Sequence, residues 1–597
     1  MNIARRAIRL LSLGLLPGGL LGCADIAEPA PDYQTACASC HSAQLFSGMS
    51  EERVFRTLEA GIMTPFADRM SVSQRRALAR DIATAEEIPL RDDAFCADRT
   101  VSVDPFAVSG WNGWSPGADN SRYHPEPGLS ADDVPGLELV WAFGFAGDLS
   151  SYSQPAVLGD HVFVGSNAGS VYALLAETGC VQWRFEAGAP VRTAMVVAPV
   201  DGGHAVLFGD QTGRFYAVDA GTGEALWSRA ADAHPAARIT GSPVVHGRNV
   251  FVPVASWEEM LASLPDYPCC TFRGSVVALD TATGDEVWKS VLQAEAPEPQ
   301  APAPDGRPLW GPSGSPTWST PTVDAGRGVL YVTTGNNYTG PATGTSDAVL
   351  ALDMNTGQML WARQLTPGDV FSGCATCQEE RGPDFDFGSS AILGKLSDGG
   401  DILLAGQKSG VVYGLDPDEN GRILWETRVA RGSTHGGVQW GMATDGAYVY
   451  VPIADGALIG VVDDDLVSRR RMDPDDGGGL VALRVDDGTV AWEAPPSRVC
   501  EGIPRCSPSQ LAAATAIPGI VFSGAMDGHI RAYAAASGAV VWDLDTAREY
   551  DAVNRVQSNG GALNGNGPVV SGGRVFVNSG YNHFGTMTGN VLLAFAP

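Results

Sequence analysis

The stretch GSVYALLAETGCVQW (169–183) decides the fold, because its pattern returns along the rest of the chain. Its alternating apolar residues are typical of a half-buried strand, and its Thr-Gly pair marks a tight turn before a second short strand that ends in tryptophan. GRFYAVDAGTGEALW (213–227) and GSVVALDTATGDEVW (274–288) repeat the pattern closely, and degraded copies begin at residues 347, 410, 479 and 528. Because units of this size cannot bury their own apolar faces, we expect them to stack on one another.

The repeats predict an all-β, eight-bladed β-propeller over residues 99–597, built from four-stranded sheets arranged radially. An eighth copy, GNVLLAFAP (589–597), stops before a tryptophan, and Trp141 in LELVWAFGF supplies the missing one. We therefore expect the first blade to take its last strand from the C-terminus, which closes the ring. Insertions at 289–316 and 362–386 are expected to form loops on one face. The tryptophans assigned to the eight blades are Trp141, Trp183, Trp227, Trp288, Trp361, Trp425, Trp492 and Trp542.

Residues 1–22 are typical of a secretory signal, with a positive start that includes Arg5 and Arg6 and an apolar stretch LLSLGLL. The segment ends in LLGC, which resembles a bacterial lipobox, so we expect export to the periplasm or cell envelope and a lipid anchor at Cys23. A plain signal peptide cleaved nearby is the alternative. The net charge of −29 argues against nucleic acid and anionic surfaces as partners. The membrane is therefore expected as a partner only through the anchor.

CASCH (37–41) is a c-type haem attachment signature, in which Cys37 and Cys40 bind the haem covalently and His41 ligates its iron. Amphipathic helical segments follow the motif, so residues 23–98 are expected to form a small all-α cytochrome c domain. Met63 is the preferred sixth ligand and Met70 the alternative. Either methionine could instead fill the core.

Eight further cysteines remain, and an even number in an exported protein predicts disulfides. Short loops favour pairing Cys374 with Cys377 and Cys500 with Cys506. A bond between Cys96 and Cys180 would join the two domains. Whether the adjacent pair Cys269–Cys270 is bonded to itself or to other cysteines stays open, because sequence alone does not give connectivity.

An exported eight-bladed propeller with tryptophan-docked repeats and a fused cytochrome c resembles the pyrroloquinoline quinone (PQQ) alcohol dehydrogenases, most closely the polyvinyl-alcohol dehydrogenase (cytochrome) group. The segments that carry the resemblance are SGWNGW, WAFGF, YPCCTFRGSVVALD, GPDFDFG and GQKSGVVYGLD. The resemblance implies one haem c, PQQ and a metal ion as cofactors. It implies oxidation of a secondary or polymeric alcohol to a carbonyl compound, with electrons leaving through the haem to an external acceptor such as a cytochrome c or a quinone-pool component.

The same resemblance implies the metal ligands. Glu258 in NVFVPVASWEE is the first choice, with Glu259 as the alternative, and the bland interpretation is a solvated pair of loop carboxylates. Asn336 in YVTTGNNY is the second ligand. Asp384 in GPDFDFG is both a further ligand of the ion and the catalytic base, and Asp386 matches the extra ligand of lanthanide-using relatives. Calcium is the default ion, since hard cations take oxygen ligands, and a lanthanide is possible.

The quinone-binding residues follow by resemblance as well. Trp318 in SPTWSTPTVD is expected under the quinone rings, and Lys408 in GQKSG on the quinone oxygens. Arg192 and Thr240 are candidate partners of the quinone carboxylates. Cys269 and Cys270 are expected to approach the quinone, although they follow the metal glutamate in the chain, whereas the methanol-type relatives have such a pair upstream.

Two other functions stay open. A PQQ dehydrogenase for a sugar, an aldehyde or a small alcohol would share every residue above. A lipid-anchored propeller with similar repeats could also be a scaffold for outer-membrane protein assembly, but a scaffold needs neither the haem motif nor Asp384, Lys408 and Trp318.

Overall fold

The computed structural model describes residues 111–597 apart from 265–266, 379–380, 463–467, 504 and 582–584. Before residue 111 it describes residues 51, 54–55, 58, 67, 70–83, 90–101 and 110. Cys23, Cys37, Cys40, His41 and Met63 lie outside the described residues.

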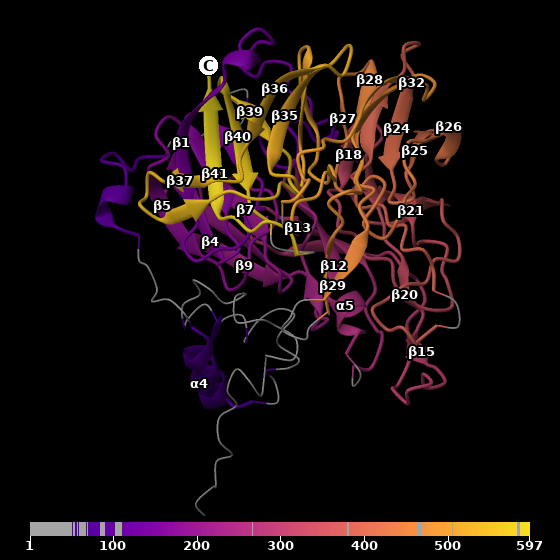
Figure 1. Ribbon diagram of the computed structural model, residues 1–597. Helices are drawn as coiled ribbons and strands as arrows, with labels where there is room; N and C mark the ends of the chain where they lie inside the picture. The colour runs from indigo at the N-terminus through magenta and orange to yellow at the C-terminus, as the bar shows by residue number, and fades with distance from the viewer. Residues whose placement is uncertain are drawn as a thin grey trace, which may run out of the picture.

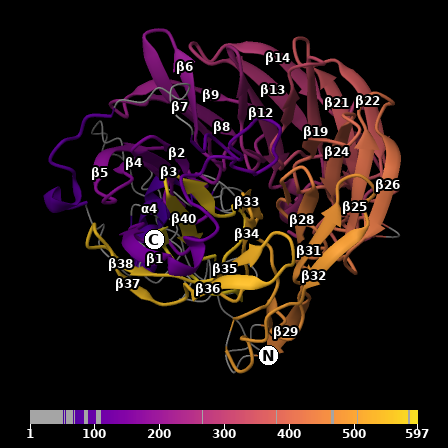
Figure 2. The ribbon, with the colours of Figure 1, turned by 90° about the horizontal axis from the view of Figure 1, so that it is seen from above.

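Eight antiparallel sheets stand around a common axis, which confirms the eight-bladed β-propeller (Figure 2). Each blade has four strands, except that in one of them β10 and β11 both pair with β12. The first four complete blades are β2 (Ala156–Leu158), β3 (His161–Gly165), β4 (Ser170–Leu175) and β5 (Val181–Glu186); β6 (Val196–Val200), β7 (Gly203–Gly209), β8 (Arg214–Asp219) and β9 (Ala225–Ala230); β10 (Ala237–Arg238), β11 (Val244–His246), β12 (Asn249–Ser256), β13 (Ser275–Asp280) and β14 (Glu286–Val291); and β18 (Thr322–Asp324), β19 (Val329–Thr333), β21 (Ala348–Asp353) and β22 (Met359–Gln364). The next three are β23 (Ile392–Lys395), β24 (Asp401–Gly406), β25 (Val411–Asp416) and β26 (Arg422–Arg428); β27 (Ala443–Thr444), β28 (Tyr448–Pro452), β31 (Leu480–Arg484) and β32 (Val490–Ala494); and β33 (Thr515–Ile517), β34 (Ile520–Gly524), β35 (His529–Ala534) and β36 (Val540–Asp545).

The last blade joins the two ends of the propeller. Its order is β1 (Glu138–Gly144), β41 (Val591–Ala596), β40 (Arg574–Ser579) and β39 (Val569–Ser571). Closure by pairing of the chain ends is thus confirmed. One detail differs from the prediction: GNVLLAFAP forms the third strand rather than the last, and β1, which carries Trp141, is the outer one.

Most of the repeated tryptophans tie their blade to the next one. The Trp183 indole N–H donates to the Ala220 carbonyl oxygen at 2.9 Å, and Trp141 makes the same bond to Ala176 at 3.0 Å. The turn glycine of the repeat faces this ring: a Cβ at Gly223, whose φ is +74°, would lie 2.7 Å from Trp183. The Thr-Gly turn and the tryptophan therefore recur together because they contact each other across blades.

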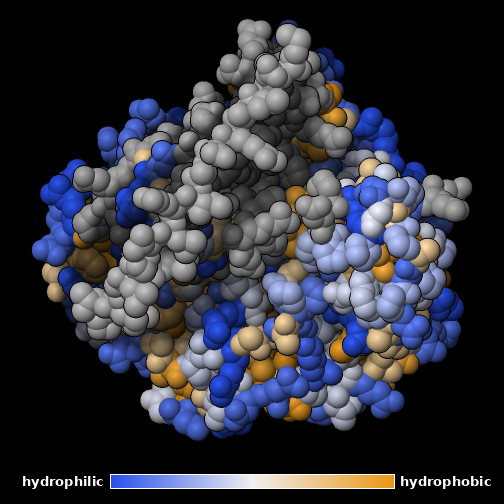
Figure 3. All heavy atoms as spheres, turned by 90° about the horizontal axis from the view of Figure 1, so that it is seen from below, coloured by the Kyte–Doolittle hydropathy of each residue, from blue (hydrophilic) through white to orange (hydrophobic). Residues whose placement is uncertain are grey.

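Extra segments connect the blades. They include α5 (Glu258–Leu261), η3 (Val134–Gly136) and the hairpins β15 (Glu298–Pro299) with β16 (Trp310–Gly311), β17 (Ser313–Gly314) with β20 (Asn337–Thr339), β29 (Leu458–Val462) with β30 (Ser468–Met472), and β37 (Glu549–Asp551) with β38 (Gln557–Asn559). Figure 1 shows α5, β15, β20 and β29 together on one side of the blades. Figure 3 shows the molecule from this side, where hydrophilic residues surround scattered hydrophobic ones in the described part.

The described part of the N-terminal region contains α4 (Val72–Ile82) and η2 (Asp92–Ala94). Ser71 and Gln74 form a capping box at the start of α4, which satisfies two free backbone N–H groups. Leu78 and Ile82 pack against Phe55 and its neighbours, and Met70 packs on this small core. No helix in the described residues is long and apolar enough to span a membrane. The boundary between residues 98 and 99 stays a prediction.

The four predicted or open cysteine pairs are all bonded. Cys96–Cys180, Cys374–Cys377 and Cys500–Cys506 form as predicted. Cys269 and Cys270 are bonded to each other. The Cys96 bond fixes the segment before the propeller to the β4–β5 turn, where the Cys96 N–H also donates to the Val181 carbonyl oxygen at 2.9 Å.

Candidate active site

A buried lysine lies between two aspartates near the end of β24. Lys408 Nζ donates to Asp384 Oδ1 and to Asp386 Oδ2, both at 2.9 Å. The Lys408 backbone N–H also bonds the Asp386 carbonyl oxygen at 3.1 Å, which ties the GQKSG turn to the GPDFDFG segment. All three residues are almost completely buried. The GQKSG and GPDFDFG motifs therefore form a single site.

Asp386 connects this ion triple to two other predicted residues. The Trp318 indole N–H donates to Asp386 Oδ2 at 3.2 Å, and the Asn336 backbone N–H donates to Asp386 Oδ1 at 2.8 Å. Lys408 Nζ lies 5.4 Å from the centre of the Trp318 ring. Gly388 lies against the same ring, because a Cβ there would come within 1.8 Å of it. The structure therefore brings Trp318, Asn336, Asp384, Asp386 and Lys408 together.

The backbone at Asp384 is held in an unusual conformation. Its φ is +61°, in the left-handed region that costs non-glycine residues energy and recurs at functional sites. The Asp369 carboxylate accepts the backbone N–H groups of Asp384 at 3.2 Å and Phe385 at 2.8 Å, and so fixes this conformation. Asp369 was not singled out from the sequence, where nothing distinguishes it from other loop aspartates.

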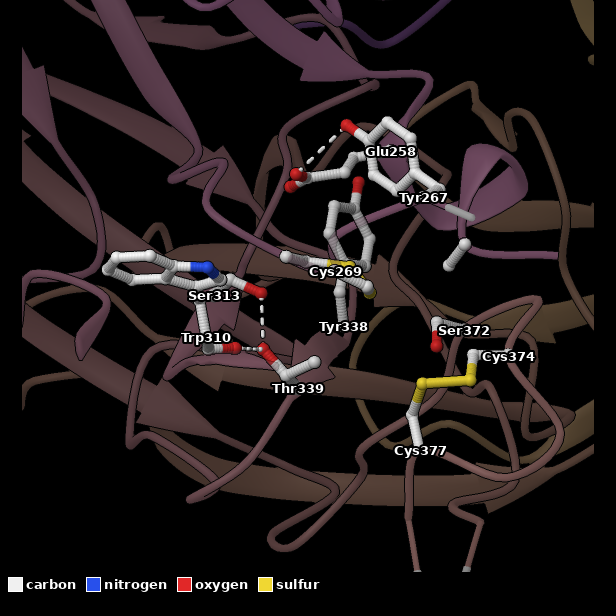
Figure 4. The surroundings of a disulfide bond; sticks show 12 residues. Glu258, Tyr267, Cys269, Trp310, Ser313, Tyr338, Thr339, Ser372, Cys374 and Cys377 are labelled. Carbon is white, nitrogen blue, oxygen red and sulfur yellow. Dashed lines mark hydrogen bonds between the residues drawn. A yellow bond between two sulfur atoms is a disulfide. The ribbon is translucent and has the colours of Figure 1, made fainter. Parts of the chain in front are cut away.

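The two adjacent glutamates of α5 have different surroundings. The Glu258 carboxylate accepts the backbone N–H groups of Thr271 at 2.9 Å and Phe272 at 2.7 Å, and the Tyr267 hydroxyl at 3.1 Å (Figure 4). Glu259 instead interacts electrostatically with Asp386 and Lys408, and burial raises its pKa from 4.5 to about 7. Successive helical residues point about 100° apart, so one glutamate holds a loop while the other joins the cluster. The structure therefore favours Glu259, the alternative, over Glu258 as the acid of the site.

Asp347 is a member of the cluster that the sequence analysis missed. It is fully buried, and neither carboxylate oxygen has a hydrogen-bond partner among the described residues. Burial, with the charges of Asp386, Asp369 and Asp384, holds its pKa well above the usual range. The signal in the sequence was its position, since the other seven repeat copies begin with glycine where this one begins with Asp347.

The oxygen atoms at the cluster suit a hard cation. Asn336 Oδ1 is buried and has no partner in the described part of the chain, as is true of both Asp347 oxygens. Carboxylate and amide oxygens are what Ca²⁺ and similar ions prefer. The described residues contain no group of three or more His, Cys, Asp or Glu already spaced to hold a metal, and Lys408 lies between the two nearest carboxylates. The donor atoms are of the type that such an ion prefers, but the Lys408 ammonium group occupies the position between Asp384 and Asp386.

Two arginines lie beside the acidic cluster. Arg192 packs over Trp440, 4.4 Å from its ring centre, and donates to the Tyr581 hydroxyl at 3.2 Å. Arg238 interacts electrostatically with Arg192 and Glu259, and its buried Nε has no hydrogen-bond partner among the described residues. Guanidinium groups are strong partners for planar carboxylates. Arg192 was predicted from the sequence and Arg238 was missed.

Trp440 joins Arg192 to Trp318, on which it packs edge to face with ring centres 4.9 Å apart. A small cavity of about 20 Å³ lies here, lined by Trp318, Trp440, Trp114, Thr320 and Thr240. The buried Thr240 hydroxyl has no hydrogen-bond partner in the described residues. Aromatic walls, a free hydroxyl and nearby guanidinium groups are the kinds of groups that hold a flat anionic ligand, although the cavity itself has room for little more than a water molecule.

The Cys269–Cys270 pair lies to one side of this cavity. Both residues are fully buried in a core that includes Phe272, Leu309 and Tyr338. In Figure 4 the Tyr338 ring lies beside the disulfide, and Tyr338 interacts electrostatically with Glu259 and Arg238. The pair therefore neighbours the cluster through Tyr338, and its contact with a quinone stays a prediction.

The fold and this site together define a class, the β-propeller alcohol dehydrogenases. The family model described as "Glucose/ethanol/alcohol dehydrogenase, beta-propeller domain" matches residues 111–436, and a model for the outer membrane protein assembly factor BamB matches 346–589. The chain is 37% identical to a polyvinylalcohol dehydrogenase of Pseudomonas sp., over 100% of this chain and 99% of that one. It is 36% identical to the polyvinylalcohol dehydrogenase of Sphingopyxis sp. (strain 113P3), over 94% and 92%.

A solved structure supports the fold. The quinohemoprotein alcohol dehydrogenase ADHIIG from Pseudomonas putida HK5 superposes with a TM-score of 0.63 and 19% identity, over 84% of this chain and 83% of that one. The chain belongs to the PQQ-dependent alcohol dehydrogenase family, within the group that includes the polyvinylalcohol dehydrogenases.

Proposed function

We propose that this protein oxidises the secondary alcohol groups of a polymer such as polyvinyl alcohol, using PQQ and a metal ion. The observation that carries the proposal is the buried Asp384–Lys408–Asp386 triple beside Trp318 and the cavity. The full-length relatives named as polyvinylalcohol dehydrogenases support the polymeric substrate. A scaffold would gain nothing from burying this much charge, since unpaired buried carboxylates are costly.

PQQ, when bound beside the ion, supplies the two-electron acceptor for the alcohol. Asp384 takes the proton of the substrate hydroxyl. Burial raises the pKa of Asp384 well above its usual range, although Lys408 opposes the shift, and such a raised pKa suits a general base working near neutral pH.

Lys408 keeps a positive charge inside the site. Burial lowers the pKa of Lys408, but the carboxylates of Asp384, Asp386 and Glu259 outweigh this effect and hold it above the usual value. A fixed ammonium is available to stabilise negative charge that develops on the quinone oxygens. Trp318 supplies the flat apolar wall, and Glu259, Asn336 and Asp386 supply oxygen atoms for the ion.

The electrons are proposed to leave through a haem c held by Cys37, Cys40, His41 and Met63, and to pass to an external acceptor. Figure 1 draws α4 on the side of the propeller where α5 lies, which supports a route from the site to the N-terminal region. Export to the periplasm and anchoring at Cys23 complete the proposal.

The test uses full-length protein supplied with PQQ and either Ca²⁺ or La³⁺. Haem reduction is followed by absorbance with polyvinyl alcohol, small secondary and primary alcohols, and sugars. We expect the fastest reduction with the polymer and with secondary alcohols, and reduction slowed by ~10²–10⁴ in Asp384→Asn. Reduction by sugars alone would overturn the substrate assignment, and turnover of an artificial dye without haem reduction would overturn the electron route.

A further inference from the structure

The first residue of each repeat copy is a position where a side chain does not fit. A Cβ at Gly274 would lie 1.8 Å from the Ser315 carbonyl oxygen, and one at Gly479 would lie 1.9 Å from the Ala494 carbonyl oxygen. Several of these glycines also have positive φ, such as +91° at Gly169 and +78° at Gly410. Glycine is thus favoured at this position by space, by backbone conformation or by both.

Asp347 occupies this position in the blade that carries Asn336. Its φ is +48°, so it takes the left-handed conformation that the glycines take. An aspartate there costs backbone strain, and its full burial with no hydrogen-bond partner in the described residues costs further free energy. A side chain kept at such a cost in one blade, against glycine in the others, points to a role in function.

The surroundings of Asp347 show what that role is. Its backbone N–H donates to the Gly335 carbonyl oxygen at 3.1 Å, and Gly335 lies against Asp386 Oδ1, where a Cβ would come within 2.6 Å. Asp347 therefore lies beside the segment of Gly335 and Asn336, which contacts the Asp386 carboxylate. Its carboxyl interacts electrostatically with Asp386, Asp369 and Asp384, which with burial raise its pKa, so it becomes an added negative charge of the cluster when a cation binds there.

The charges of the cluster do not balance within the described residues. Two cationic side chains, Lys408 and Arg238, interact with it. Five carboxylates belong to it: Glu259, Asp347, Asp369, Asp384 and Asp386. Without a cation, burial and mutual repulsion raise the pKa values of Glu259, Asp347 and Asp384 and so favour their protonated forms, whereas a bound cation would let these carboxyls ionise.

We propose that Asp347 is an additional anionic group of the cation site, and that it biases the site toward a trivalent ion. The inference rests on the proposed function, since it assumes that an ion binds beside Asn336 and Asp386. Each added negative charge attracts a trivalent ion half again as strongly as a divalent one at the same distance. Removing Asp347 must therefore weaken trivalent binding more than divalent binding.

The experiment measures ion binding to the full chain after chelator treatment, without PQQ or substrate. Tb³⁺ binding is followed by luminescence sensitised through tryptophan, with Ca²⁺ as competitor. Asp347→Asn removes the charge and keeps the shape. Asp347→Gly installs the residue of the other seven copies, which suits the backbone conformation and so guards against misfolding. Asp386→Asn is the positive control, and Asp210→Asn, a buried aspartate after β7, is the negative control.

Both Asp347 variants are expected to lose about tenfold or more in Tb³⁺ affinity and less in Ca²⁺ affinity, while Asp210→Asn binds as wild type. Wild-type Tb³⁺ affinity in both variants would overturn the role of Asp347. Equal loss for both ions would overturn the preference for a trivalent ion. If wild type binds no ion that Asp386→Asn removes, the cation site of the proposed function itself is absent, which is a separate result.

Discussion

Lys408 Nζ lies 2.9 Å from Asp384 Oδ1, and this buried ion pair joins the GQKSG turn to the GPDFDFG segment. The pair places a fixed positive charge beside the proposed base. It also links the roles of the two residues: removing Lys408 leaves Asp384 as an unpaired buried carboxylate, whereas removing Asp384 leaves Lys408 paired with Asp386 alone.

Asp384→Asn is expected to slow substrate-dependent reduction of the enzyme by a factor of ~10²–10⁴, because the amide keeps the shape but cannot accept the proton. Stopped-flow reduction of protein loaded with PQQ measures the step. PQQ content and haem absorbance should stay unchanged, since this side chain is not proposed to hold either cofactor alone. Lys408→Ala should lower PQQ retention as well as rate, and normal turnover by Asp384→Asn would remove the base from this position.

Substitution of the two glutamates of α5 is expected to have different effects, on stability for Glu258 and on ion binding for Glu259. Glu258→Gln replaces the charged acceptor of the Thr271 and Phe272 N–H groups by a neutral one. The free energy of unfolding should therefore fall by about 1–3 kcal/mol, and the melting temperature should fall with it. Glu259→Gln should leave stability closer to wild type but reduce ion affinity. Differential scanning calorimetry and ion titration on both variants make the comparison. Loss of ion binding in Glu258→Gln alone would restore Glu258 as the ligand.

The contrast between these glutamates shows which features could not be predicted from the sequence. The blades could be predicted because Trp183, Gly223 and the equivalent pairs contact each other in most of the repeats, and a periodic contact leaves a periodic pattern. Glu258 and Glu259 could not be separated, because a single helical turn decides which one turns inward. Asp347 left a sequence signal, a missing glycine, whose meaning depended on the position of Gly335 in space.

Ion binding is expected to depend on pH through Glu259. Burial raises the pKa of Glu259 from 4.5 to about 7 in the ion-free protein. An incoming ion must displace this proton, so the apparent affinity should rise as pH rises through about 7. Because the folded state holds the proton more tightly than the unfolded chain, Glu259's contribution to ion-free stability is full below about 4.5 and is lost as pH rises through about 7. Titrations at several pH values should show the step in wild type and Glu258→Gln but not in Glu259→Gln; a flat profile in wild type would contradict the assignment.

Met63 and Met70 are expected to differ as haem ligands. Met70 packs on the small core formed by Phe55, Leu78 and their neighbours, which gives its side chain a structural task. Met63→Ala should therefore lose the near-infrared Met–Fe absorption band, while Met70→Ala should keep it and lose melting temperature instead. Spectra of the oxidised proteins, recorded with equal haem content, make the comparison. Loss of the band in Met70→Ala with its retention in Met63→Ala would transfer the ligand to Met70, and the core around α4 would then have to open to release that side chain to the iron.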